Sequence, residues 1–369
     1  MSTRAARALS RPLTLGGLTL PNRVAMAPMT RAHSPGGVPG ADTAAYYARR
    51  AAGGTGLVIT EATYIGHPAA GQHDAVSHIY GDAALAGWAK VTDAVHAAGG
   101  LIFSQLQHVG MARKPGEPPN PETPPIGPSG VPLDPSAGPG RTMSQQDIDQ
   151  VVQAFADAAS AAAAHGFDGI ELHGAHGYLI DQFLWAATNR RTDAYGGDLR
   201  SRTRFAAEVV AGVRAAVPTG LPIVVRLSQW KQNDFGARIA QTPEEFDVIL
   251  GALTDAGADA FHASTRRYWQ PAFDGSDLNL AGWAKKLTGK PAISVGSVGL
   301  DVEFTASLGG ADAGATTIEG LLDRLEADEF DMIAVGRSLL ADPEWTAKVI
   351  DGRESEITRF TPAALATLH

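Results

Sequence analysis

Eight short apolar runs, each followed by a longer segment of helical spacing, constrain the fold of this chain more than any other feature. The runs are almost continuously hydrophobic, which is typical of parallel strands covered on both faces. They lie at residues 23–28, 56–61, 101–106, 169–173, 222–228, 259–264, 291–296 and 330–336. The spacing of apolar residues predicts helices at 82–98, 145–165, 200–216, 243–256, 278–287 and 338–351.

This alternation predicts a (β/α)8 TIM barrel, in which each strand is followed by a helix that packs outside it. An open, doubly wound sheet is the alternative, but no strand is followed by a G-x-G-x-x-G signature and the chain contains no P-loop. Helix start signals support the expected boundaries, since Thr242 precedes Pro243 and Asp342 precedes Pro343. Because such barrels often exceed the usual length of one domain, we expect residues 1–369 to form a single domain.

Residues 111–144 interrupt the alternation of strands and helices. They contain many prolines and glycines and show neither a helical nor a strand period over most of their length. A compact domain rarely carries so long a loop without a function. Because the segment follows the third predicted strand, we expect it to form a cap over the barrel mouth that narrows access. A disordered excursion is the alternative interpretation.

Composition excludes several classes of function. The formal charge of -9 over 369 residues argues against nucleic acid or an anionic membrane as a partner. The absence of cysteine excludes disulfides, thiolate nucleophiles and iron–sulfur clusters. The N-terminal residues lack the apolar run of a secretory signal, and no stretch approaches the ~18 apolar residues of a membrane span. We therefore expect a cytoplasmic protein.

One strand end combines two histidines and a tyrosine. In a barrel the chemistry lies at the carboxyl ends of the strands, and the stretch IELHGAHGYLIDQFL at 170–184 places His173, His176 and Tyr178 at such an end. Two neutral imidazoles can donate hydrogen bonds to one substrate oxygen while the phenol transfers a proton. A metal-dependent hydrolase or lyase with His173 and His176 as ligands is the alternative, although metal sites usually add a carboxylate or a third histidine. A purely structural role for two buried histidines is a third interpretation.

Other strand ends supply hydrogen-bond donors and a candidate anion site. Thr30, Gln105 and Arg226 end or follow apolar runs, so they could together line the polar edge of a planar heteroaromatic ring. The last two strands end in glycine, and their turns could bind a phosphate through backbone N–H groups and one guanidinium. These turns contain Gly296, Ser297, Gly336 and Arg337. Ordinary turn glycines without a ligand are the alternative.

Four further residues have open or structural interpretations. Tyr268 and Trp269 follow the sixth predicted strand, where they either wall the substrate site or pack against the cap. His108 and His262 are expected to be structural histidines.

Taken together, these motifs resemble those of the old yellow enzyme family of FMN-dependent ene-reductases. The resemblance extends over about residues 9–350. The motifs that carry it are NRVAMAPMTR (22–31), ITEAT (59–63), QLQHVG (105–110), HGAHGYLIDQFL (173–184), NRRTDAYGG (189–197), VRLS (225–228), VGSVG (295–299) and AVGR (334–337).

The resemblance implies an activity and roles for the site residues. It implies an enzyme that binds FMN and uses NADPH or NADH to reduce the activated C=C bond of α,β-unsaturated carbonyl or nitro compounds by ping-pong hydride transfer from flavin N5. It implies that His173 and His176 hold the activating oxygen and that Tyr178 is the proton donor. The residues implied in FMN binding are Pro28, Met29, Thr30, Ala62, Gln105 and Arg226 at the ring, and Gly296, Ser297, Gly336 and Arg337 at the phosphate.

The chain also departs from the pattern of the family. Gln107 and Met111 stand where many members have tryptophan and arginine, and S-Q-W-K at 228–231 replaces a more usual Ser-Pro. The sequence therefore leaves open the natural substrate, its stereochemistry, the choice between NADH and NADPH, and whether the protein is a monomer or a homodimer. A flavin or phosphate binder without catalytic activity is a further alternative.

Overall fold

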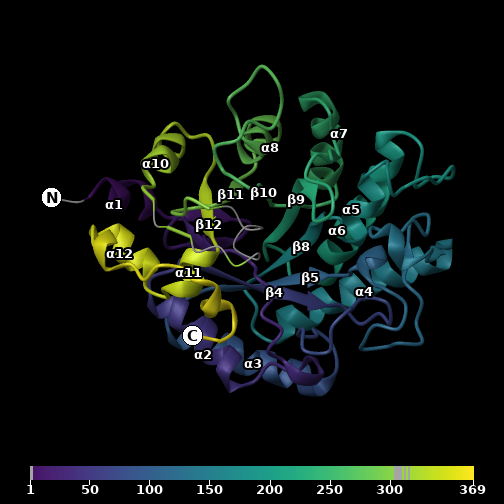
Figure 1. The fold of residues 1–369 in the computed structure, drawn as a ribbon, viewed down its shortest axis with the longest axis horizontal. Coiled ribbons are helices and arrows are strands. Elements are labelled where there is room, and N and C mark those ends of the chain that lie inside the picture. Colours follow the sequence, from purple (N-terminus) through teal and green to yellow (C-terminus); the bar gives the residue numbers. More distant parts are fainter. Residues whose placement is uncertain (1–2, 303–309, 311–312, 315) are drawn as a thin grey trace.

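The computed structural model describes residues 3–302, 310, 313–314 and 316–369. Its centre is a closed barrel of parallel strands surrounded by helices (Figure 1). The predicted barrel is confirmed, and each of the eight predicted runs overlaps a barrel strand. In order around the barrel these are β3 (Val24–Met26), β4 (Leu57–Tyr64), β5 (Ile102–Gln107), β8 (Gly169–His176), β9 (Ile223–Lys231), β10 (Ala260–Ser264), β11 (Ala292–Val295) and β12 (Met332–Val335).

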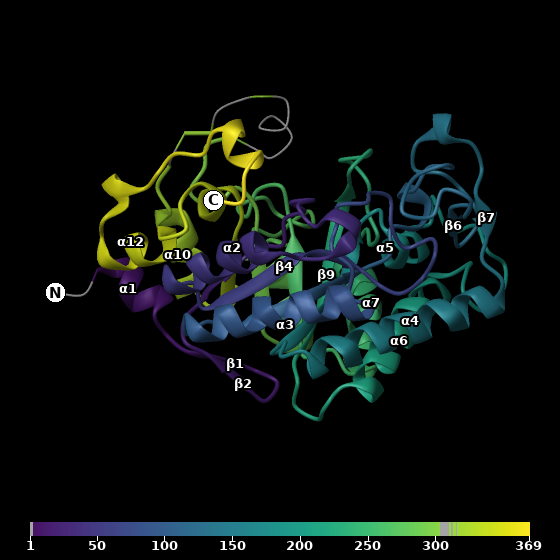
Figure 2. The same ribbon diagram turned by 90° about the horizontal axis from the view of Figure 1, so that it is seen from below.

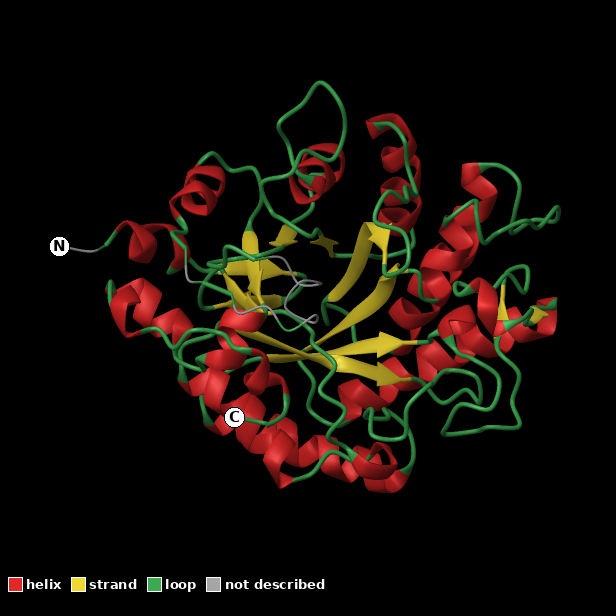
Figure 3. Ribbon diagram, in the orientation of Figure 1, coloured by secondary structure: helices red, strands yellow, loops and turns green. Residues whose placement is uncertain are grey.

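Helices cover the outside of the barrel (Figure 3). They are α1 (Arg4–Leu9), α2 (Ala41–Ala52), α3 (Asp82–Ala97), α4 (Gln145–Ala164), α5 (Leu179–Leu184), α6 (Leu199–Ala216), α7 (Pro243–Asp255), α8 (Leu280–Thr288), α10 (Glu319–Glu326), α11 (Arg337–Ala341) and α12 (Trp345–Asp351). The start signal at α7 is confirmed, since Thr242 accepts a hydrogen bond from the Glu245 N–H and Pro243 is the first helical residue. In the described part of the chain, no helix is both long and apolar enough to cross a membrane.

The prediction of one continuous helix over 338–351 is wrong. The helices α11 and α12 lie on either side of Asp342 and Pro343. A residue before proline avoids the helical conformation, and Asp342 has φ -131° and ψ 100°. Its carboxylate accepts hydrogen bonds from the Glu344 N–H at 3.0 Å and from the Lys348 ammonium at 2.8 Å.

The bottom of the barrel interior is apolar. Side chains point alternately into and out of the barrel along each strand. The hairpin of β1 (Leu13–Leu15) and β2 (Leu18–Leu20) closes the end where the strands begin (Figure 2). The buried interior side chains here include Leu15, Leu57, Phe103, Val224, Ala260, Ile293 and Met332.

A polar layer follows above this apolar floor. Four neighbouring strands each carry a buried polar residue further along the inward face, namely Gln105, Glu171, Arg226 and His262. The strand register pairs Gln105 with Glu171 and Arg226 with His262, so these residues occupy similar levels of the barrel. The alternation of the strands thus places charged and polar groups directly below the mouth.

Residues 111–144 form an excursion after β5, the third strand of the barrel. The excursion contains β6 (Ile126–Gly127) and β7 (Arg141–Thr142), which pair in parallel and lie on the opposite side of the molecule from the β1–β2 hairpin (Figure 2). A Cβ added to Gly177, just beyond β8, would lie 3.1 Å from Leu133 of this excursion. The predicted cap therefore contacts the mouth at its rim, beside the end of β8.

Arg113 stabilises the first part of the excursion through hydrogen bonds to backbone carbonyl groups. Its buried guanidinium donates hydrogen bonds to the carbonyl oxygens of Gly71, Glu117, Pro118 and Asn120. One planar group therefore satisfies several backbone acceptors that would otherwise lose their partner.

We predict that Arg113→Met lowers the free energy of unfolding by about 2–4 kcal/mol, because several backbone carbonyls lose their donor. Denaturant unfolding followed by circular dichroism measures this loss. The matched control is Lys114→Ala, which removes an exposed ion pair with Asp134 and should leave the unfolding midpoint near that of the wild type. Equal losses in the two variants would contradict the anchoring role of Arg113.

Candidate active site

His173, His176 and Tyr178 meet where β8 reaches the mouth of the barrel. The centroids of the two imidazole rings are 5.1 Å apart and the rings cross at 81°. The phenol ring lies 4.9 Å from the His173 ring at 88°. Both histidines are buried, while Tyr178 is partly exposed. The structure therefore brings together the three residues that were expected to act on the substrate.

The strand was expected to end at His173, but β8 continues to His176. Residues three apart in a regular strand point to opposite faces. The register between β8 and β9 shifts between Gly174 and His176, which indicates a β-bulge. This bulge lets both imidazoles face the same space, and it places His176 at φ 63°, an uncommon conformation for a residue other than glycine.

The His176 ring is held by two neighbouring strands. Its Nε2 lies 2.8 Å from Ser264 Oγ on β10, and the indole ring of Trp230 on β9 lies 4.6 Å from the imidazole. Trp230 Nε1 in turn donates a hydrogen bond of 3.1 Å to the Ser264 carbonyl. These contacts restrict rotation of the imidazole.

Both imidazoles are neutral near pH 7. Burial lowers the pKa of His173 and of His176 well below the usual value, and the positive charge of Arg226 lowers each pKa further. A neutral imidazole carries one N–H group, which can donate to an oxygen atom. The pair is therefore suited to bind and polarise a substrate oxygen.

A buried carboxylate lies in the polar layer with Arg226. Glu171 accepts a hydrogen bond of 2.7 Å from Gln105 Nε2 and contacts His262 Nδ1 at 2.7 Å. Burial alone raises the pKa of Glu171, but its interactions with His262 and Arg226 hold that pKa below the usual value. The carboxylate is therefore ionised and partly balances the charge of the guanidinium.

Two buried nitrogen atoms in this layer have no hydrogen-bond partner in the described part of the chain. They are Arg226 Nε and His262 Nε2. Arg226 also donates to Ser264 Oγ at 3.3 Å, so only part of its hydrogen-bonding capacity is used there. A buried polar atom without a partner calls for an explanation, and a bound group with acceptor atoms fits the Nε of Arg226.

Sequence reasoning missed Glu171 and Trp230. Glu171 precedes His173 by two residues, so strand alternation directs both to the same face. The available signal was a single acidic residue inside an otherwise apolar strand. Trp230 carried no signal beyond its place in the unusual S-Q-W-K segment.

The loop after β3 contains three of the residues implied in cofactor binding. Pro28 and Met29 are half-buried and Thr30 is exposed. Glu61 on β4 fixes this loop, because its carboxylate accepts hydrogen bonds from two successive N–H groups, the first from Arg31 at 2.8 Å. The next residue, Ala62, is buried and pairs in register with Gln105.

The turns after β11 and β12 lie side by side. Gly296 has φ 150°, and a Cβ there would lie 2.7 Å from the Thr265 carbonyl oxygen. Ser297 Oγ donates to the Arg266 carbonyl at 3.0 Å. Ser338 Oγ donates to the Val298 carbonyl at 3.0 Å and so connects the two turns.

Gly336 and Arg337 begin α11 beside these turns. A Cβ on Gly336 would lie 3.5 Å from Met29 Sδ, so this glycine is close to the loop after β3. The buried Arg337 guanidinium donates to the Val302 carbonyl at 2.7 Å and lies 5.8 Å from the centre of the Phe360 ring. The predicted phosphate residues thus come from adjacent loops.

Tyr268 and Trp269 lie next to the turn after β11. The Tyr268 N–H donates to the Gly296 carbonyl at 3.1 Å, and its ring is buried with its hydroxyl 3.5 Å from a Cβ placed on Gly320 of α10. The exposed Trp269 ring packs against Tyr268 at 4.9 Å. These contacts place the Tyr268 ring beside α10, and none of them involves the imidazole pair.

A metal site at the imidazole pair is disfavoured by charge. The positive charge of Arg226 acts on both imidazoles and would repel a metal cation bound between them. His176 Nε2 already contacts Ser264 Oγ. Within the described ranges, no three or more His, Cys, Asp or Glu side chains are grouped so that they could hold a metal ion.

Known relatives align with most of the chain. The profile of the NADH:flavin oxidoreductase / NADH oxidase family matches residues 8–356. The NADH oxidase of Thermoanaerobacter brockii is 34% identical over 354 residues, which are 94% of this chain and 51% of that protein. The flavin oxidoreductase hxnT of Emericella nidulans is 33% identical over 369 residues, which are 95% of this chain and 91% of that protein. The chain thus spans about half the length of the first relative and most of the second.

Solved structures show the same relationship. Morphinone reductase superposes with a TM-score of 0.78 at 30% sequence identity, over 97% of this chain and 92% of that chain. The resemblance inferred from the sequence motifs is therefore confirmed. The chain belongs to the NADH:flavin oxidoreductase / NADH oxidase family, which is the old yellow enzyme family, and it is an FMN-dependent oxidoreductase.

Proposed function

We propose that this protein uses NADH or NADPH to reduce the activated carbon–carbon double bond of α,β-unsaturated carbonyl or nitro compounds. The observation that carries the proposal is the pair of neutral, buried imidazoles of His173 and His176 with the Tyr178 phenol beside them. This set suits a substrate that needs one oxygen polarised and one carbon protonated.

The residues proposed to hold FMN come from strand ends around the mouth. Arg226 Nε, which has no partner among the described residues, supports a bound group that has acceptor atoms. The adjacent turns at Gly296 and Gly336, with the buried guanidinium of Arg337 beside them, support an anionic tail on that group. We assign Pro28, Met29, Thr30, Ala62, Gln105 and Arg226 to the flavin ring, and Gly296, Ser297, Gly336 and Arg337 to the phosphate. Bound FMN supplies the hydride transfer between the nicotinamide and the substrate carbon.

The imidazoles are proposed to bind the carbonyl or nitro oxygen of the substrate. Each neutral ring offers one N–H donor, and the fixed position of His176 between Trp230 and Ser264 aligns its ring before the substrate arrives. Withdrawal of electron density through the oxygen makes the distant alkene carbon more electrophilic. The loss of one such donor costs roughly 10²–10³ in rate in comparable oxyanion sites.

Tyr178 is proposed to protonate the other alkene carbon. Burial raises the pKa of its phenol above the usual value, and a hydrogen bond from Gln232 partly offsets this rise. Gln232 Nε2 donates to the phenol oxygen at 2.9 Å, so the phenolic proton itself remains directed elsewhere. Tyr178 therefore enters the reaction protonated.

We predict that Tyr178→Phe slows the reduction of 2-cyclohexenone by roughly 10²–10⁴-fold, because the general acid is lost. Reduction of bound FMN by NADH should stay near the wild-type rate, since that step needs no proton from the phenol. Anaerobic stopped-flow absorbance measures the two half-reactions separately. Tyr195→Phe, which removes a tyrosine hydroxyl that is bonded to Gln145 and Glu208, is the matched control and should change neither. An equal fall in both half-reactions of Tyr178→Phe would exclude the proton-donor role.

The alkene step should also be independent of pH over a defined range. The pKa values of His173 and His176 lie well below about 6.5 and that of Tyr178 lies above about 10, so none of the three changes its protonation state between about pH 6.5 and 9. The rate constant of the alkene step, measured by stopped flow in buffers across this range, should therefore be flat. An inflection within this range that disappears in His173→Asn would show that the imidazole is protonated there.

A further inference from the structure

Strand β9 continues beyond the point where its pairing with β10 ends. Leu227 is the last β9 residue paired with β10, but β9 extends to Lys231. This extension pairs with the far side of the β8 bulge, where Lys231 is opposite His176. His176 with φ 63° and Gly177 with φ 85° follow one another in the left-handed region, which carries a conformational cost at the histidine. The surrounding contacts must therefore hold this backbone in place.

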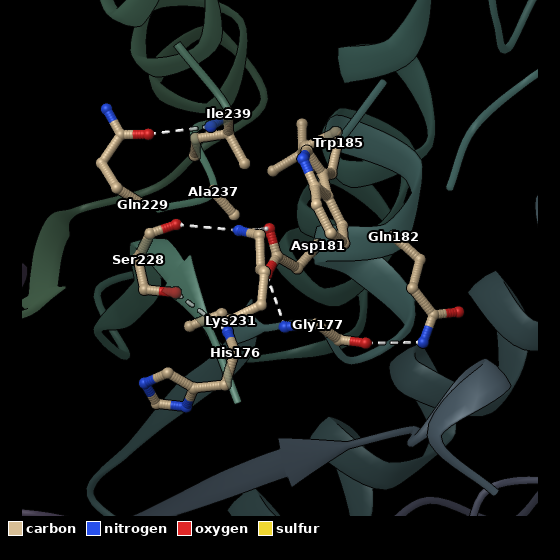
Figure 4. A network of polar contacts seen from close by, with 12 residues as sticks. His176, Gly177, Asp181, Gln182, Trp185, Ser228, Gln229, Lys231, Ala237 and Ile239 are labelled. Carbon is tan, nitrogen blue, oxygen red and sulfur yellow. Dashed lines mark hydrogen bonds and ion pairs between the residues drawn. The ribbon is translucent and has the colours of Figure 1, made fainter. Parts of the chain in front are cut away.

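A fully buried ion pair lies next to this backbone (Figure 4). Lys231 Nζ lies 2.7 Å from Asp181 Oδ1, and both side chains are inaccessible to solvent. The ammonium also donates to the Ser228 carbonyl at 3.2 Å. Burial raises the pKa of Asp181 and lowers that of Lys231, and the charge of each residue opposes the shift in the other.

The second carboxylate oxygen of Asp181 binds the strained segment itself. Asp181 Oδ2 accepts a hydrogen bond of 2.6 Å from the Gly177 N–H (Figure 4). Gln182 Nε2 donates to the Gly177 carbonyl at 2.6 Å, and Ser228 Oγ accepts from the His176 N–H at 2.9 Å. The backbone between the imidazole pair and Tyr178 is thus bound at consecutive positions by groups from α5 and β9.

Stability alone does not account for such a pair. Removing two charges from water is costly, and two apolar side chains of similar size often stabilise a protein at least as well. A buried ion pair instead imposes one geometry, because each partner is strongly unfavourable without the other. Here the geometry that it imposes joins the end of β9 to the first turn of α5, directly after Tyr178, the N-cap residue of that helix.

We propose that Lys231 is a positioning residue for the reaction. Through its ion pair with Asp181, Lys231 holds the left-handed backbone of His176 and Gly177 and thereby sets the directions of the His176 ring and the Tyr178 phenol. This inference rests on the proposed function, because it assigns the geometry of the same donors.

The test uses the FMN-loaded protein with Lys231→Met, which keeps most of the side-chain volume and removes the ammonium. Reduction of 2-cyclohexenone should slow by roughly 10- to 100-fold, as expected when reacting groups are misplaced by about 1 Å. FMN reduction by NADH and the FMN dissociation constant should each stay within about threefold of wild type, because the displaced groups are the substrate donors. Hydrogen–deuterium exchange of the amides of Gly177 and Tyr178 should become faster, because the acceptor of the Gly177 N–H loses its anchor.

The matched control is Lys285→Met on α8. Lys285 Nζ forms ion pairs with Asp328 at 2.6 Å and with Asp331 at 2.9 Å, at a place remote from the mouth. This variant makes the same chemical change and should alter neither the alkene step nor the exchange at Gly177. A selective effect in Lys231→Met would therefore show that the His176 ring and the Tyr178 phenol are misplaced, and not that the protein has lost stability in general.

A second variant covers the case in which Lys231→Met fails to fold. The double variant Asp181→Asn/Lys231→Met buries no unpaired charge and keeps an acceptor for the Gly177 N–H. It removes the ion pair that connects α5 to β9. It should show the same selective loss and the same faster exchange. Wild-type exchange at Gly177, or equal changes in the two half-reactions, would overturn the positioning role in either variant. If the wild-type protein does not reduce alkenes, the proposed function fails, but the exchange measurement still decides whether the pair holds this backbone.

Discussion

The charge of Arg226, buried beside Glu171 and His262, governs the chemistry at the mouth of this barrel. Burial lowers the pKa of both imidazoles on β8, and this charge lowers it further, so both rings are neutral. The charge also opposes the binding of a metal cation at the same place. Arg226 Nε has no partner in the part of the chain that the structure describes and can donate to an acceptor group. The carboxylate of Glu171 makes this burial tolerable, because an isolated guanidinium in an apolar barrel would be far more costly.

The inward-facing side chains of the barrel form an apolar layer and a polar layer. The first inward positions of the strands, together with the β1–β2 hairpin, form an apolar floor. The next inward positions on β5, β8, β9 and β10 are polar and support the groups at the mouth. The ends of β8 and β9 then depart from regular geometry, with a bulge, a left-handed histidine and a buried ion pair. In the proposed function, this irregular backbone carries the side chains whose orientation matters for the reaction.

The sequence predicted the barrel and the grouping of His173, His176 and Tyr178, because both depend on local patterns. Apolar runs and their flanking glycines are read within a few residues, and the three site residues share one short motif. The continuation of β8 to His176 could not be predicted in this way, because the bulge depends on pairing with β9, some fifty residues later. The pairing of Lys231 with Asp181 depends on the same long-range register. The sequence contains the signal for the break, because Asp342 and Pro343 are typical of a helix start. The prediction nevertheless placed one helix across this signal, whereas in the structure α11 ends before Asp342.

The proposed reaction is tested most directly by mixing anaerobically reduced, FMN-loaded protein with 2-cyclohexenone and following the visible absorbance of the flavin. We expect the absorbance of oxidised FMN to return, with one molecule of cyclohexanone formed for each flavin oxidised. This result would show that the mouth of the barrel passes both a hydride and a proton to an activated alkene. A flavin that stays bleached in excess enone, while still being oxidised by other acceptors, would contradict the proposed use of the imidazole pair and the phenol.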